Sequence, residues 1–162
     1  MKKTLEKKDF SSFLKAKEIL LSLKEEEQRK DMKLELPKLP KEIEQEIKKN
    51  FFEIETCFKN SCYRSVLILC GKILEIALHR KYFEITSKDL LEKAPDIGLG
   101  NLIKKLKEEG FDTDPGLNNQ IHLINQLRIH SVHKKTKPFD PSREQALATI
   151  LYTLDILKKL FG

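Results

Sequence analysis

The stretch CYRSVLILCGKILEIALHRKYF, residues 62–83, decides the fold. Drawn as a helix, it has apolar residues on nearly every side, which is typical of a helix surrounded by neighbours. Its β-branched residues would also suit a strand, but more than twenty residues without a turn exceed ordinary strand length. We therefore predict a central, buried helix.

The segment before it, residues 41–59, carries a single apolar stripe. Its members recur at spacings of three or four residues: Ile43, Ile47, Phe51, Ile54 and Phe58. This spacing predicts an amphipathic helix. Pro37 and Pro40 precede it, and each removes a backbone donor and favours an extended residue before it.

Turn and capping signals predict the helices that follow. Residues 87–98 indicate a short helical turn and a loop, and residues 99–110 indicate a helix that stops at Gly110. Asp114-Pro115 and Asp140-Pro141 each pair an N-cap acid with a proline at the first helical position. They predict the starts of the last two helices.

The N-terminal region forms a separate part in this interpretation. Ser11 or Ser12 could cap a first amphipathic helix that ends in a charged run. We predict an N-terminal arm over residues 1–33, a proline-containing linker over 34–40 and a helical bundle over 41–162. The expected fold is all-α, an antiparallel four- to five-helix bundle with an extra N-terminal helix.

Composition limits the cellular setting. The longest apolar run, residues 66–70, is far shorter than a membrane span, and charged residues 6–9 interrupt any signal peptide. We expect a cytoplasmic protein with no membrane partner. The three cysteines, Cys57, Cys62 and Cys70, lie in apolar helical sequence without metal-binding spacing, which predicts reduced core thiols.

The stretch LRIHSVHKK, residues 127–135, carries the chemistry of interest. Arg128 continues the apolar stripe of Leu117, Ile121 and Ile124, so it should point inward or toward an interface. A cation there needs a carboxylate or a phosphate partner. Two interpretations stay open: a structural ion pair with Glu75 in the central helix, or an arginine that binds the phosphate of a substrate.

The histidines of this stretch also have two interpretations. An ideal helix places His133 about 140° from Arg128, so the two meet only if the helix end distorts or if two subunits each supply half of a site. His133 would suit proton transfer to or from a ribose 2′-hydroxyl. Equally, it could be an ordinary histidine at the negative end of a helix.

Several other chemistries are excluded or disfavoured. His130 and His133 lie one turn apart, but no third ligand is near, so we predict no metal and no cofactor. His79 is expected on the surface at the end of the central helix. No phosphate-binding glycine loop, nucleophile elbow or zinc-protease motif occurs in the chain.

Residues Arg128-Ile-His-Ser-Val-His133 match the Arg-x4-6-His pattern of the HEPN superfamily of helical bundles, near the end of the helix before the last. The stretch LPKEIEQEIKKNFFEIETCFKNSCYRSVLILCGKILEIALHR, with its Leu74-Glu75 dipeptide, resembles the opening of a HEPN-related family of unknown function often attached to restriction and defence proteins. The resemblance spans residues 36–161.

This resemblance implies a metal-independent endoribonuclease that acts at a dimer interface. Arg128 would hold phosphate, His133 would serve the 2′-hydroxyl attack and His130 would assist. Residues 128–143 include five lysines and arginines but only one acidic residue. Three of these basic residues, Lys134, Lys135 and Lys137, would contact the RNA backbone.

We expect a homodimer that binds RNA and belongs to a defence or toxin system. The alternative is a non-catalytic interaction and dimerisation module, in which Arg128 pairs with Glu75 and the N-terminal helix binds another protein. Whether the chain is an enzyme is left open by the sequence.

Overall fold

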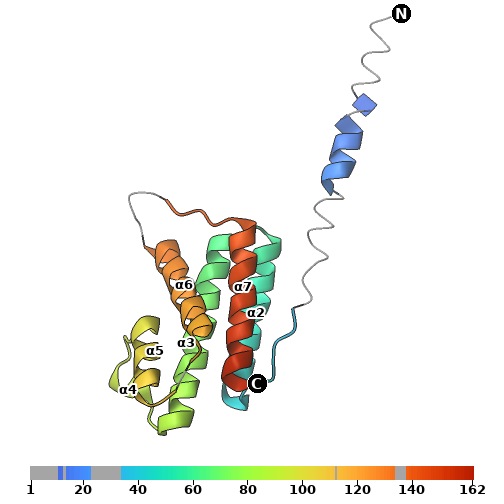
Figure 1. Cartoon of the computed structure of the whole chain (residues 1–162). Coiled ribbons are helices and arrows are strands. Elements are labelled where there is room, and N and C mark those ends of the chain that lie inside the picture. Colours follow the sequence, from blue (N-terminus) through green and yellow to red (C-terminus); the bar gives the residue numbers. More distant parts are fainter. Residues whose placement is uncertain (1–10, 13, 23–33, 112, 134–137) are drawn as a thin grey trace, which may run out of the picture. The chain divides into compact units, whose positions relative to one another are not determined.

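The computed structural model describes residues 11–12, 14–22, 34–111, 113–133 and 138–162. The chain divides into two compact units, Met1–Leu34 and Glu35–Gly162. In the first unit, residues 11–12 and 14–22 are helical, and the predicted capping role of Ser11 or Ser12 depends on residues outside the described ones. The second unit is a helical bundle, which confirms the predicted all-α fold (Figure 1).

Four long helices and two short ones make up the described part of the second unit. They are α2 (Lys41–Lys59), α3 (Tyr63–Thr86), α4 (Leu90–Lys93), α5 (Leu99–Glu108), α6 (Pro115–Val132) and α7 (Arg143–Phe161). The long helices alternate in direction along the chain, while α4 and α5 lie beside the C-terminal half of α3 (Figure 1). Among the described residues, no helix is both long and apolar enough to cross a bilayer.

Helix α3 is the centre of the bundle, as its sequence predicts. It contacts every other helix of the unit. Its buried residues cover about half of its circumference, not nearly every side as its sequence predicts: Val66, Leu67, Cys70, Gly71, Ile73, Leu74, Ala77, Leu78 and Tyr82. Helix α2, by contrast, buries a single stripe against α3, which includes Ile47, Phe51 and Ile54. Burying these side chains supplies most of the driving force for the fold, at roughly 1.5–3 kcal/mol for each large apolar residue.

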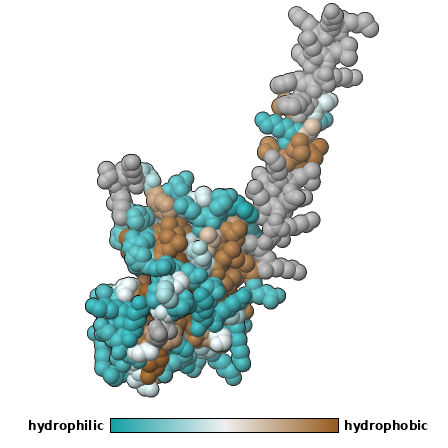
Figure 2. Space-filling view, in the orientation of Figure 1, coloured by the Kyte–Doolittle hydropathy of each residue, from teal (hydrophilic) through white to brown (hydrophobic). Residues whose placement is uncertain are grey.

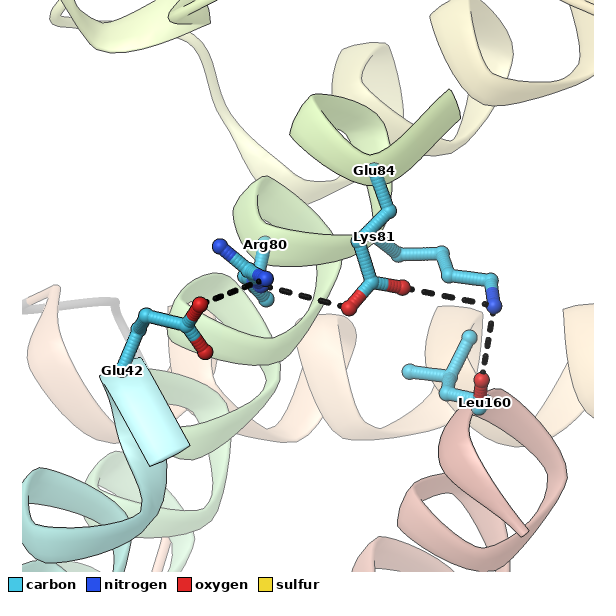
Figure 3. Close-up of polar contacts among 5 residues, drawn as sticks. All are labelled: Glu42, Arg80, Lys81, Glu84 and Leu160. Atoms are coloured by element: carbon cyan, nitrogen blue, oxygen red, sulfur yellow. Dashed lines mark hydrogen bonds and ion pairs between the residues drawn. The ribbon is translucent and has the colours of Figure 1, made fainter. Parts of the chain in front are cut away.

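Polar contacts fasten the ends of the helices to each other. Arg80 of α3 pairs with Glu42 of α2 at 3.0 Å and with Glu84 at 3.2 Å, and Lys81 donates to the carbonyl of Leu160 in α7 at 2.9 Å (Figure 3). The C-terminal ends of α3 and α7 therefore lie together. These two helices run in the same direction, although consecutive long helices are antiparallel.

The capping prediction is correct for α6 and wrong for α7. Asp114 accepts a hydrogen bond from the N–H of Leu117 at 2.9 Å and caps α6. Helix α7 is capped by Ser142, whose hydroxyl accepts from the N–H of Gln145 at 3.1 Å, while the Gln145 side chain accepts from the Ser142 N–H at 2.9 Å. This reciprocal capping box satisfies two donors at once, so the helix starts two residues later than Asp140-Pro141 predicts.

The cysteines do not share one environment. Cys70 is buried in α3, and burial raises the pKa of its thiol to about 12. Cys57 is only partly buried, and Cys62 is exposed because it lies at the surface, immediately before α3 begins. The prediction of three core thiols is therefore wrong for Cys62.

We expect the Ser142→Ala variant to lose about 1 kcal/mol of unfolding free energy, since α7 loses its cap. The matched Asp140→Ala variant should stay within about 0.5 kcal/mol of the parent chain. Urea denaturation of the three proteins measures both values. A larger loss for Asp140→Ala than for Ser142→Ala would place the cap at Asp140 instead.

Candidate functional site

Helix α6 carries Arg128 on its inner face. Leu117, Ile121 and Ile124 are buried along the same face and pack toward α3. Arg128 follows them one turn later, because residues four apart lie on the same side of a helix. The guanidinium is thus brought to the seam between α6 and α3, where the sequence predicts it.

Gly71 is the reason that Arg128 fits into this seam. A Cβ atom on Gly71 would lie 2.4 Å from Cδ of Arg128, which is too close for a real contact, and 3.1 Å from Cγ, which is tighter than most contacts. The aliphatic stem of Arg128 therefore crosses α3 at the position where a side chain is missing. This close approach explains a glycine in the middle of a buried helix, where it would otherwise be unfavourable.

Beyond Gly71, the guanidinium meets Glu75, one turn further along α3. Nη1 of Arg128 donates to Oε1 of Glu75 at 2.5 Å. The Arg128 side chain is 29% exposed and the Glu75 side chain 32%, so the pair is neither fully buried nor freely solvated. Among the described residues, Glu75 is the hydrogen-bond partner of this guanidinium, which leaves most of its five N–H donors for solvent or a ligand.

The two histidines lie near the C-terminal end of α6. Nδ1 of His130 lies 2.7 Å from the carbonyl oxygen of Gln126, and its ring packs edge-on against Phe139 with 6.2 Å between centroids. His133 follows the last helical residue, and its N–H still donates to the carbonyl of Ile129 at 3.0 Å. Its side chain is exposed.

Within one chain, the structure does not assemble Arg128 and His133 into a site. No hydrogen bond or ion pair among the described residues joins them. The His133 N–H keeps its helical hydrogen bond, so the end of α6 is not unwound before this residue. The two side chains therefore keep the divergence of about 140° that an ideal helix predicts.

The predicted RNA-binding lysines are not among the residues that the structure describes. Lys134, Lys135 and Lys137, the expected RNA contacts, fall in residues 134–137, which are not among the described residues. In the part of the chain that is described, no three histidine, cysteine, aspartate or glutamate side chains are grouped as metal ligands would be.

A cleft beside Glu75 was not predicted from the sequence. It has a volume of about 450 Å³, and its lining includes Lys72, Glu75, His79, Arg80 and Phe83. Its existence depends on the path of the chain after α3, where Leu91 and Ile97 form the opposite wall. The apolar residues of that loop indicate that it packs against the bundle. Their spacing does not predict where it packs.

His79 lines this cleft and is half-buried, so the prediction of a surface residue is wrong. Its Nδ1 is buried without a hydrogen-bond partner in the described part of the chain. Burial lowers the pKa of this imidazole, and the negative charges of Glu75 and Asp89 act in the opposite direction. His79 is thus a neutral side chain near Glu75 at physiological pH.

No family model, curated protein or solved structure matches the chain.

Substitution of Gly71 tests the contact on which the site depends. We expect Gly71→Ala to lose about 1–3 kcal/mol of unfolding free energy, because the new methyl group displaces the stem of Arg128 or separates α3 from α6. Thermal and urea denaturation measure the loss.

Gly100→Ala is the matched control. Gly100 also lies inside a helix, but no atom comes within 4 Å of the position where a Cβ would be added. Alanine should stabilise α5 there by about 0.5–1 kcal/mol. If both alanine variants gain stability, Arg128 does not cross α3 at Gly71.

Proposed function

We propose that the chain is a HEPN-like RNA-binding protein that acts as a homodimer and cleaves RNA without a metal. The observation that carries this proposal is the state of the Arg128 guanidinium. It is oriented by Glu75 and Gly71, yet it is 29% exposed and keeps unused donors. A guanidinium oriented in this way is well suited to hold a phosphate through paired hydrogen bonds.

The proposed chemistry uses the three residues of the motif in separate roles. Arg128 holds the scissile phosphate and balances the charge that develops on its oxygens. His133 accepts the proton of the ribose 2′-hydroxyl, whose oxygen attacks the adjacent phosphorus. The bond to the 5′ oxygen breaks, and His130 protonates the leaving oxygen. The products are a cyclic phosphate and a free 5′-hydroxyl.

A second copy of the chain is required in this proposal, because Arg128 and His133 diverge within one protomer. Exposed apolar side chains lie on the two helices that would meet the twin: Val132 on α6, and Leu151 and Tyr152 on α7. Val132, at 55% exposure, lies directly beside His133. Figure 2 shows apolar surface over both helices. Covering this surface in a two-fold dimer would bring two helix ends together.

The remaining parts of the proposal concern the surroundings of the site. Lys134, Lys135 and Lys137 would bind the RNA backbone, which gives affinity without sequence preference. We place the protein in the cytoplasm, in a defence or toxin setting.

A non-catalytic interaction module is the second candidate. It is favoured by the Arg128–Glu75 pair, which is complete within one chain. It is also favoured by the N-terminal helix, where Leu14, Ile19, Leu20 and Leu21 are exposed and could bind a partner protein. In this case Arg128 would serve stability alone.

Incubation with total RNA in excess EDTA tests cleavage directly. We expect the parent chain to cut RNA, and the His133→Ala variant to lose activity by roughly two to four orders of magnitude, because general acid–base catalysis contributes about that much. His122→Ala is the control, since His122 is exposed on the same helix but distant from the motif. Intact RNA after incubation with the parent chain would contradict the cleavage proposal.

The Arg128→Lys variant separates the two candidates. Lysine keeps the charge but not the paired donors. Under the RNA proposal, the melting temperature falls because the contact with Glu75 is weakened, and RNA binding by gel shift weakens as well. Under the interaction-module candidate, the melting temperature falls and the parent chain itself does not bind RNA.

A further inference from the structure

The turn between α2 and α3 brings two cysteines into a defined geometry. Helix α2 ends with the N–H of Cys62 donating to the carbonyl of Cys57 at 2.8 Å, and the N–H of Ser61 donating to the carbonyl of Phe58 at 3.1 Å. Ser61 has a left-handed backbone conformation, with φ of 59°. These three features define a Schellman motif, in which Cys57 and Cys62 occupy the two positions whose side chains commonly touch.

The backbone hydrogen bond sets an upper limit on the separation of the two residues. The Cα of Cys57 lies about 2.4 Å from its own carbonyl oxygen, and the N of Cys62 lies about 1.5 Å from its Cα. Together with the 2.8 Å between oxygen and nitrogen, the two Cα atoms are at most about 6.7 Å apart. Disulfides join Cα atoms separated by about 4.4–6.8 Å, so the backbone needs little movement to accept one.

The side chain of Cys62 lies over the turn. Sγ of Cys62 donates to the carbonyl of Asn60 at 3.6 Å, so it is turned back over the turn toward the end of α2. The pKa of the Cys57 thiol is raised, first by burial and then by the neighbouring Cys62 and Glu53.

The two thiols differ in access to solvent in a way that suits stepwise oxidation. Cys62 is exposed, at the N-terminal end of α3. Cys57 is partly buried behind it. Cys70, the remaining cysteine, is buried in the core and has a thiol that resists ionisation.

We propose that Cys57 and Cys62 are a redox-active pair that hydrogen peroxide converts to an intramolecular disulfide across the α2–α3 turn. The sulfur of Cys62 attacks one peroxide oxygen, the O–O bond breaks, and a sulfenic acid and water form. The sulfur of Cys57 then attacks the sulfenic sulfur. The S–S bond forms, the hydroxyl group leaves and takes the Cys57 proton as a second water. Two thiols are oxidised and one peroxide is reduced to two waters.

This pair is independent of the proposed RNA chemistry. The disulfide would close a six-residue ring that joins the end of α2 to the start of α3. The ring ends before α3 begins, away from Gly71 and Glu75. Reduction by a dithiol would reverse the bond.

Mass spectrometry of the full chain tests the proposal. The reduced protein is freed of reductant and treated with hydrogen peroxide in stoichiometric amounts. We expect the intact chain to lose the mass of two hydrogen atoms and to regain it after treatment with dithiothreitol. Lys59 lies between the two cysteines, so trypsin should release residues 50–59 and 60–64 as two peptides held together by the disulfide.

Single variants assign the bond. Cys57→Ser and Cys62→Ser should each fail to lose two hydrogen atoms, whereas Cys70→Ala should behave as the parent chain. The proposal is overturned if the parent chain gains oxygen atoms without forming the linked peptides. It is also overturned if the linked peptides contain Cys70, or if the disulfide joins two chains on a non-reducing gel.

Discussion

The contact of Arg128 with Gly71 and Glu75 determines how α6 is oriented on the central helix. A guanidinium in an apolar seam is unfavourable unless a carboxylate meets it, and a hydrogen bond to such a charged group contributes about 1.5–3 kcal/mol. Glu75 supplies the carboxylate at 2.5 Å, and Gly71 supplies the space for the stem. Because this contact determines which side of α6 faces α3, it also determines that His133 points elsewhere.

This orientation gives α6 two functional faces that are separated by its own geometry. One face holds Arg128 against α3, with the exposed Val132 one turn further along it, and the other presents His130 and His133 near the end of the helix. The bundle around it is held at both ends of α3. Arg64 donates to the carbonyl of Phe139 at 2.8 Å near one end, and Lys81 donates to that of Leu160 near the other. Helix α3 is therefore held in place and orients the guanidinium. The proposed chemistry also requires a second protomer.

The sequence predicts the elements that depend on local periodicity and fails for those that depend on packing. The stripe of α2, the central position of α3 and the start of α6 at Asp114 are all visible in the spacing of residues. Glu75 is also recognisable as the partner of Arg128, since few carboxylates lie in apolar sequence. Gly71 is not, because a close approach between two helices leaves no signal in either helix alone.

The remaining differences have similar causes. Asp140-Pro141 has the local pattern of a helix start. The capping box of Ser142 and Gln145 satisfies two backbone N–H donors, so α7 begins after Ser142 instead. The sequence around Cys62 predicts a buried helix. The chain turns between α2 and α3 at this residue, so Cys62 is exposed. The cleft beside His79 forms only when residues 90–97 fold back on α3, which is a tertiary event.

Complementation between two inactive variants tests the central claim, that Arg128 and His133 act across two protomers. Arg128→Gln and His133→Ala are refolded together in equal amounts, and ribonuclease activity in EDTA is compared with that of each variant alone. If each site takes its arginine from one chain and its histidine from the other, half of the dimers are mixed and carry an intact site. The account predicts recovery of about a quarter of the parent activity. A mixture as inactive as the separate variants, beside an active parent chain, would contradict it.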